Sequence, residues 1–259
     1  MGRTAAWAAL ASYLIVIWQT VVAQSLPRLT HWAEATLLIG AGMATFAALT
    51  RRLSWIKVLI GVIAIAIIGT AAHATGAATS MPFGPFTYTD EIGPRLWKVI
   101  AWPMTVLWLV AALNARGVAR MILRPWRKTK RYGFWVIGLA TVLLMAFVLA
   151  LDPYASKVRT FWVWQPTRFN FTWFGMPWTN LWGWGLTALV AYAFATPFLV
   201  NKEARRRKQP PDYQPLIIWD LALLLFAVSA GIAGQWLVVA VSAGLAAVSS
   251  VAAIRGARW

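Results

Sequence analysis

Long apolar runs constrain the fold of this sequence more than any other feature. Runs of about 20 residues with few charges recur along the chain, and each is long enough to cross a hydrocarbon core of roughly 30 Å. Of the 259 residues, 60% are hydrophobic and only 12% are charged. The sequence therefore predicts an all-α, polytopic membrane bundle that forms a single transmembrane domain over residues 1–259.

Eight of these runs are expected to form membrane-spanning helices. Glycine and proline inside them are tolerated, because neighbouring helices can satisfy the freed backbone groups. The first run is interpreted as a retained helix rather than a signal peptide, because residues 24–27 (QSLP) lack the small-x-small pattern of a cleavage site. The expected spans are about 5–23, 31–50, 55–74, 97–115, 133–151, 179–200, 216–233 and 236–254.

The basic residues predict how the bundle is oriented. A formal net charge of +17 would suggest nucleic-acid binding in a soluble protein. Here most of the 24 Lys and Arg residues fall on the side that holds both termini, so the positive-inside rule predicts an N-in/C-in, multi-pass protein of a bacterial inner membrane. Orientation and attraction to anionic membrane lipid then explain the charge, and no nucleic-acid partner is predicted. The basic segments of that side are 51–57, 116–131, 202–208 and 255–258.

Several kinds of chemistry lack their usual residues in this sequence. The absence of cysteine excludes disulfides, thiolate catalysis and Cys-ligated metal. Neither the phosphate-binding GxxxxGK[ST] motif nor a Gly-x-Ser-x-Gly nucleophile elbow is present. His31 and His73 are not spaced as a metal pair, and only composition would support a metal site made from His73 and nearby carboxylates. No metal or cofactor is predicted.

Acidic residues near the predicted outer face are the remaining candidates for chemistry. Asp90 and Glu91 lie in the loop after the third span, Asp152 ends the fifth span, and His73 ends the third. A carboxyl group beside apolar and aromatic walls is poorly hydrated, so it can retain a proton and donate it to a weak base. The structural alternatives are a turn residue before a proline for Asp152, and a helix cap or a contact with Arg95 for Asp90.

Tryptophan is concentrated in one outer connection. Six of the 18 tryptophans lie between residues 162 and 184. Trp and Tyr favour membrane interfaces, and this preference explains most of the other tryptophans. Six in one connection exceed what anchoring two helices requires, and aromatic faces can line a groove for a polyene or stabilise a developing cation. The six are Trp162, Trp164, Trp173, Trp178, Trp182 and Trp184.

Four segments between residues 70 and 200 resemble one known family in order. Residues 82–94 (PFGPFTYTDEIGP) are similar to the PFGxYxYTxxLGP signature of the CruF-type carotenoid biosynthesis membrane proteins, the carotenoid 1,2-hydratases. Residues 151–153 (LDP) and 161–164 (FWVW) resemble the family's LDP and WxW, and residues 174–184 (FGMPWTNLWGW) its YGVPxxNFxGW. Three places depart from the family's motifs, namely Phe86, Leu181 and the link 165–171. These departures bear on which substrate is used more than on whether the chain resembles the family.

The resemblance implies addition of water to the terminal C1=C2 double bond of an acyclic carotenoid such as lycopene, without a cofactor. Protonation at C2 would place positive charge on the tertiary C1, which water then captures. Asp90 or Asp152 is the expected proton donor, the other carboxylate would orient water, and Glu91 is held in reserve for either role. The expected substrate-binding residues are His73, Phe83, Phe86, Tyr88, Trp162, Trp164, Trp173, Trp178, Asn180, Trp182 and Trp184.

Two other functions compete with the hydratase. A non-catalytic carotenoid-binding or assembly subunit, with other carotenoid-pathway or photosynthetic membrane proteins as candidate partners, is favoured by the altered 165–171 link and by Leu181. The joint presence of Asp90, Glu91 and Asp152 favours the enzyme. A small-molecule transporter would need polar residues along the midplane of several spans, so it ranks last.

Overall fold

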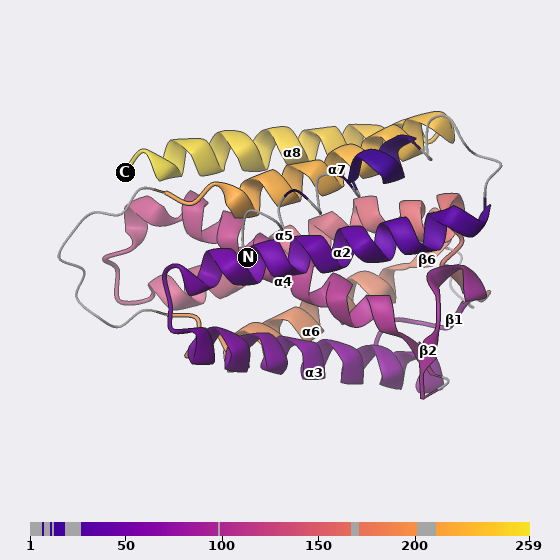
Figure 1. The fold of residues 1–259 in the computed structure, drawn as a ribbon, viewed down its shortest axis with the longest axis horizontal. Helices are drawn as coiled ribbons and strands as arrows, with labels where there is room; N and C mark the ends of the chain where they lie inside the picture. The colour runs from indigo at the N-terminus through magenta and orange to yellow at the C-terminus, as the bar shows by residue number, and fades with distance from the viewer. Residues whose placement is uncertain are drawn as a thin grey trace.

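The computed structural model shows long helices that lie roughly side by side, with their connections gathered at the two ends of the bundle (Figure 1). Every described residue of the expected first span is helical, and the basic segment 202–208 lies outside the described residues. The structure describes residues 7, 11, 13–18, 34–97, 99–166, 171–200 and 211–259 in full, and the backbone of residues 27–33.

Seven helices correspond to the second to eighth expected spans. By length and composition, five helices in the described part of the chain can cross a membrane, namely α3, α4, α5, α7 and α8. The all-α membrane bundle predicted from the sequence is thus confirmed. The helices are α2 Pro27–Thr50, α3 Trp55–Thr79, α4 Trp102–Ile122, α5 Tyr132–Pro153, α6 Trp178–Ala195, α7 Gln214–Ile232 and α8 Trp236–Ala257.

Several expected helix boundaries are corrected by the structure. Helices α3 and α4 continue to Thr79 and Ile122, past the expected ends at about residues 74 and 115. The fourth span was expected from about residue 97, but α4 begins at Trp102, because residues 95–101 fold back as a hairpin of two short strands, β2 Arg95–Leu96 and β3 Ile100–Ala101. The sixth was expected to reach residue 200, but α6 ends at Ala195. Pro197 follows closely, and it has no backbone N–H to donate to the carbonyl four residues before it, so the helical hydrogen bonds stop there.

Helix α4 is the centre of the bundle and packs against α2, α3, α5, α7 and α8. Two hydrogen bonds join it to its neighbours: the Asn114 amide donates to Thr45 of α2 at 3.1 Å, and Tyr192 of α6 donates to the Ala112 carbonyl at 2.8 Å. Such bonds replace the water that is missing between membrane helices. The centre of the bundle is therefore held by specific polar contacts as well as by packing.

Phe83 is a fully buried wedge between α3 and α6. A methyl group added at Gly76 of α3 would lie 2.6 Å from its ring, and one added at Gly183 of α6 would lie at the same distance on the other side. Small residues let helices and loops approach this closely in a membrane bundle. The wedge fixes the start of the loop after α3 against both helices.

Six short strands, which the sequence analysis did not predict, lie in the connections at one end of the bundle. Strand β1 Phe86–Tyr88 pairs antiparallel with β4 Trp162–Trp164, and β5 Thr172–Trp173 pairs with β6 Met176–Pro177. A 3-10 turn, η1 Asp90–Ile92, follows β1, and a π-helical turn, η3 Tyr154–Val158, continues α5. The pairing of β1 with β4 brings together two loops that lie far apart in the sequence.

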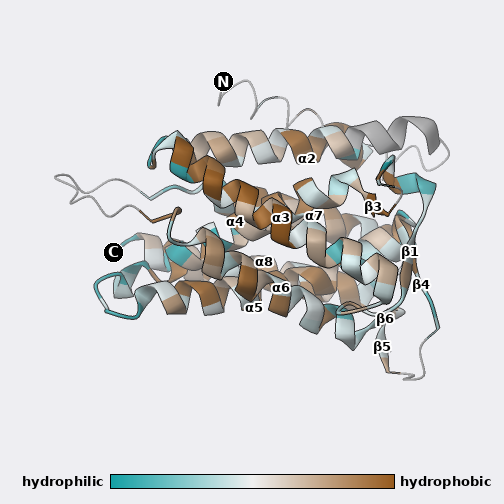
Figure 2. Ribbon diagram, turned by 90° about the horizontal axis from the view of Figure 1, so that it is seen from below, coloured by the Kyte–Doolittle hydropathy of each residue, from teal (hydrophilic) through white to brown (hydrophobic). Residues whose placement is uncertain are grey.

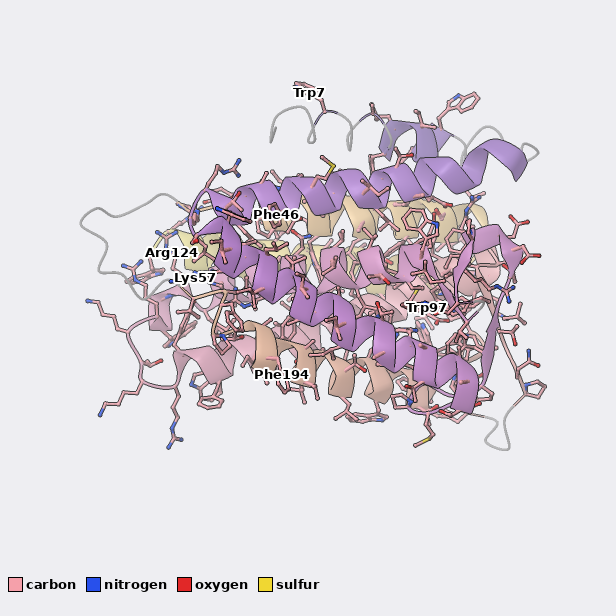
Figure 3. All side chains as sticks on the ribbon, turned by 60° about the horizontal axis from the view of Figure 1, so that its bottom comes forward. Trp7, Phe46, Lys57, Trp97, Arg124 and Phe194 are labelled. Carbon is pink, nitrogen blue, oxygen red and sulfur yellow. The ribbon has the colours of Figure 1, made fainter. Side chains whose placement is uncertain are left out.

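The two ends of the bundle differ in charge. The strand end carries β1–β6, and the basic end carries the 51–54 turn, the 123–131 loop with η2 Arg124–Trp126, and the chain's C-terminus (Figure 1). Hydrophilic residues gather toward the ends while hydrophobic residues dominate the helices (Figure 2). Lys57 and Arg124 lie at the basic end and Trp97 toward the other (Figure 3). The N-in/C-in orientation across a membrane stays a prediction from these charges.

Candidate functional site

Asp152 is a buried carboxyl group held by side-chain donors from three elements. It lies in the last turn of α5 and is 1% exposed. One oxygen, Oδ1, accepts from Trp164 Nε1 at 2.9 Å and from Ser156 Oγ at 3.2 Å. The other, Oδ2, accepts from Trp162 Nε1 at 3.2 Å and, more weakly, from Asn180 Nδ2 at 3.4 Å. These donors replace water around a group that would be costly to bury alone.

Strand geometry explains why the two tryptophans reach one carboxyl group. Side chains alternate between the two faces of a strand, so Trp162 and Trp164 share a face while Val163 points away and is exposed. The register pairs Tyr88 with Trp162 and Phe86 with Trp164, which puts two more buried aromatic side chains opposite them. The W-x-W spacing thus puts both indole N–H groups on the strand face that meets Asp152.

Ser156 reaches Asp152 because the helix does not stop at Pro153. The chain continues α5 through the π-helical turn η3, which places the Ser156 hydroxyl one turn beyond the carboxyl group. The interpretation of Asp152 as a turn residue before a proline offered no reason to select Ser156. An Asp and a Ser four residues apart on a continued helix are the signal that could have found it.

A small cavity lies against the carboxyl group. Its volume is about 10 Å³, near the least that can hold one water molecule. The Tyr88 hydroxyl and His73 Nδ1 are 3.2 Å apart at its wall, and burial raises the pKa of the Tyr88 phenol well above its ordinary value. The cavity is lined by His73, Phe86, Tyr88, Met104, Asp152, Trp162, Trp164, Asn180 and Trp184.

Aromatic rings form the walls around this cavity. The Phe83 ring stacks on His73 with centroids 4.2 Å apart. Trp184 stacks on Trp108 of α4, also at 4.2 Å, and both meet the His73 ring edge-on. Ring faces carry partial negative charge, so such walls suit a group on which positive charge develops.

A long cavity runs through the bundle between α2, α4 and α7. Its volume is about 490 Å³ and its lining is almost entirely apolar. Its lining residues run from Glu34 to Ala44 along α2 and from Gln214 to Phe226 along α7, about 15 and 18 Å at the helical rise per residue. Met104 and Trp162 line both the long and the small cavity, so these two side chains form their shared wall. An extended apolar molecule in the long cavity would have one end close to Asp152.

The structure gathers most of the expected site residues around Asp152, and leaves some aside. His73, Phe86, Tyr88, Trp162, Trp164, Asn180 and Trp184 line the small cavity, and Phe83 lies directly behind His73. Trp173 instead donates to the Leu149 carbonyl at 2.9 Å. Trp178 stacks on Phe171, and Trp182 is 69% exposed on the outside of α6.

The other two expected acids lie apart from Asp152. Asp90 is fully exposed at the start of η1 and forms an ion pair with Arg95 at 3.1 Å. Glu91 is also exposed, and lines the mouth of the long cavity at the strand end. A contact between Asp90 and Arg95 was the structural alternative to a catalytic role, and the structure contains that contact.

A second polar cluster, which the sequence analysis did not assemble, lies at the strand end of the long cavity. Arg159 Nε is 2.6 Å from Glu34 Oε1, and its Nη2 donates to Oε2 at 3.0 Å. The Tyr154 hydroxyl donates to the same carboxylate. This cluster ties α2 to the turn after α5, although residues 34 and 159 are too far apart in the sequence for any local pattern to pair them.

Among the residues that the structure describes, no three His, Asp or Glu side chains gather as metal ligands would. Fold and site together define a membrane-embedded helical bundle with a buried, hydrogen-bonded carboxyl group beside a long apolar cavity. Residues 33–249 match the family model described as carotenoid biosynthesis protein, and the chain belongs to that family. The resemblance found in the sequence is thereby confirmed at the level of the family.

One curated relative of the chain is a hydratase. The chain is 31% identical over 134 residues to bisanhydrobacterioruberin hydratase of the archaeon Haloarcula japonica. That match covers 51% of this chain and 42% of the relative, so it spans less than half of the relative's length. No solved structure matches the chain.

Proposed function

We propose that this protein is a carotenoid hydratase that adds water to the terminal C1=C2 double bond of an acyclic carotenoid. Membership of the carotenoid biosynthesis family and similarity to a hydratase support the reaction class. The long, almost entirely apolar cavity, with a volume of about 490 Å³, supports a long polyene as substrate. We place the enzyme in the cytoplasmic membrane, with the strand end outside.

One observation carries the proposal: Asp152 lines the small cavity, and Trp162, which donates a hydrogen bond to it, also lines the long cavity. The polyene would occupy the long cavity, and its end group would pass Met104 and Trp162 to reach the carboxyl group. Asp152 is favoured over Asp90 as the acid, because Asp90 is fully exposed and paired with Arg95. A solvated carboxylate is a weak proton donor to an alkene.

The reaction needs a proton, a wall that tolerates positive charge, and a water molecule. The Asp152 O–H gives its proton to C2, the π bond breaks, and C1 becomes a tertiary cation. The ring faces around the small cavity stabilise that charge. A water oxygen then bonds to C1 and loses a proton, which restores the carboxyl group. The net change is alkene plus water to tertiary alcohol.

The test is the pigment profile of a lycopene-accumulating bacterial host that expresses the chain. The wild type should give a pigment heavier by one water, Asp152→Asn should not, and the matched control Asp90→Asn should behave as the wild type. Unchanged lycopene that co-purifies with the wild type would replace the hydratase with a carotenoid-binding subunit. Lycopene that is neither changed nor bound, despite good expression, would refute the carotenoid assignment.

A further inference from the structure

His73 is the one histidine whose side chain the structure describes, and it is 4% exposed in α3. It lines the same small cavity as Asp152 and Asn180. The ring of Phe83 covers one of its faces, and rings of Phe86, Trp108 and Trp184 approach it edge-on. These rings keep the imidazole fixed in a dry setting beside the carboxyl group.

The two ring nitrogens of His73 differ in their surroundings. Nδ1 lies 3.2 Å from the Tyr88 hydroxyl. Nε2 is buried and has no hydrogen-bond partner among the described residues. Buried polar atoms rarely lack a partner, and a cavity of about 10 Å³ beside the ring has room for one water molecule. A water there would satisfy Nε2 and lie in the space that His73 shares with Asp152.

We infer that His73 Nε2 holds the water molecule that adds to the carotenoid cation and accepts its proton, an assignment that rests on the proposed hydratase function. Nδ1–H donates to the Tyr88 oxygen in this arrangement, which leaves the Nε2 lone pair facing the water. Which of the two ring nitrogens carries the hydrogen is set by the hydrogen bond that the other nitrogen makes. His73 is then a catalytic residue, because it touches a reacting molecule.

The proton balance closes within the cavity. Asp152 gives a proton to C2, the water oxygen forms a bond to C1, and the O–H bond that breaks gives its proton to His73 Nε2. The imidazolium returns that proton to the Asp152 carboxylate through the next water that enters. Without a held water the cation can instead lose a proton from C2 back to the carboxylate. When rotation about the C1–C2 bond presents the original C2 hydrogen to the carboxylate, the alkene forms again with the newly added hydrogen retained.

That second route gives a direct experiment in D₂O. Membranes that contain the full-length protein are incubated with lycopene, and two products are measured: hydrated pigment, and deuterium at C2 of the recovered lycopene. The variant His73→Phe keeps a ring that can stack on Phe83 and removes both nitrogens. Hydration should fall by about a hundredfold, the usual contribution of one acid–base group, while deuterium still enters C2.

Three other results overturn the inference. Hydration by His73→Phe at the wild-type rate would show that the imidazole has no part in water addition. Equal loss of hydration and deuterium, in a variant that still binds lycopene and melts in detergent like the wild type, would show that His73 only shapes the site. A wild type that neither hydrates lycopene nor labels C2 would overturn the proposed function as well, so the two failures can be told apart.

Two further variants keep the test decisive if His73→Phe does not fold. His73→Gln retains an amide that can hold water but cannot take its proton, so it should hydrate slowly while labelling C2. Tyr88→Phe removes the hydroxyl beside Nδ1 and should show the same split with a smaller loss. Tyr132→Phe, at the basic end, removes only a 3.4 Å contact to the Arg120 carbonyl and serves as the matched control.

Discussion

Asp152 and Asp90 both lie at the strand end of the bundle, yet their surroundings are opposite. Asp152 is almost completely buried and accepts hydrogen bonds from four side chains. Asp90 is fully exposed, and its described partners are Arg95 and the turn that it begins. The difference shows that lying at the same end of the bundle does not give two carboxyl groups the same surroundings. Burial decides which of them can keep a proton away from water.

The largest effect expected from this comparison is that of Asp152→Asn. An amide cannot supply the proton, so hydration should fall by about 10²- to 10⁴-fold, the range for loss of a general acid. The rate is measured in membranes with lycopene, at equal amounts of folded protein judged by carotenoid binding. Hydration at a tenth of the wild-type rate or more would mean that another group is the acid.

A smaller effect is expected when a donor to Asp152 is removed. Trp164→Phe deletes the 2.9 Å bond to Oδ1 and retains an aromatic ring. This bond stabilises the carboxylate that forms as Asp152 gives up its proton. A hydrogen bond to a charged group contributes about 1.5–3 kcal/mol, so hydration should fall tenfold or more. The matched control is Trp182→Phe, since Trp182 lies exposed on α6. Equal rates for the two variants would argue against a role for the Trp164 donor.

The Glu34–Arg159 pair should matter for stability more than for chemistry. Glu34→Gln removes the charge that faces a guanidinium with only 18% of its side chain exposed. Breaking a fully buried pair costs about 3–5 kcal/mol, and this partly exposed one should cost about 1–3 kcal/mol. Thermal unfolding in detergent measures the loss. A large drop in hydration with no change in melting would instead place this cluster in the reaction.

The smallest effect is expected for Asp90→Asn. Exposed ion pairs contribute little, so both hydration and melting temperature should stay within about twofold and a few degrees of the wild type. Arg95 would still donate to the Tyr88 carbonyl at 2.7 Å and so keep its support of β1. A severe loss of hydration in this variant, with folding intact, would reverse the comparison between the two acids.

The helices of the bundle could be predicted from the sequence because membrane spans are long and apolar. Strands of two or three residues could not, since they are too short to show an alternating pattern. The choice between Asp90 and Asp152 was also out of reach, because it depends on burial produced by the pairing of β1 with β4. Trp164 and Trp182 look alike in the sequence, and only the strand and helix faces separate them.

All four donors to Asp152 come later in the chain than the carboxyl group itself. The last of them, Asn180, follows by 28 residues and belongs to α6. During synthesis, α5 therefore reaches the membrane with a carboxyl group at its end and no side chain to satisfy it. Water at the interface must hydrate the group until the next loop and helix arrive. The acid is thus withdrawn from solvent only when most of the protein has been made, so partly built chains carry no finished site.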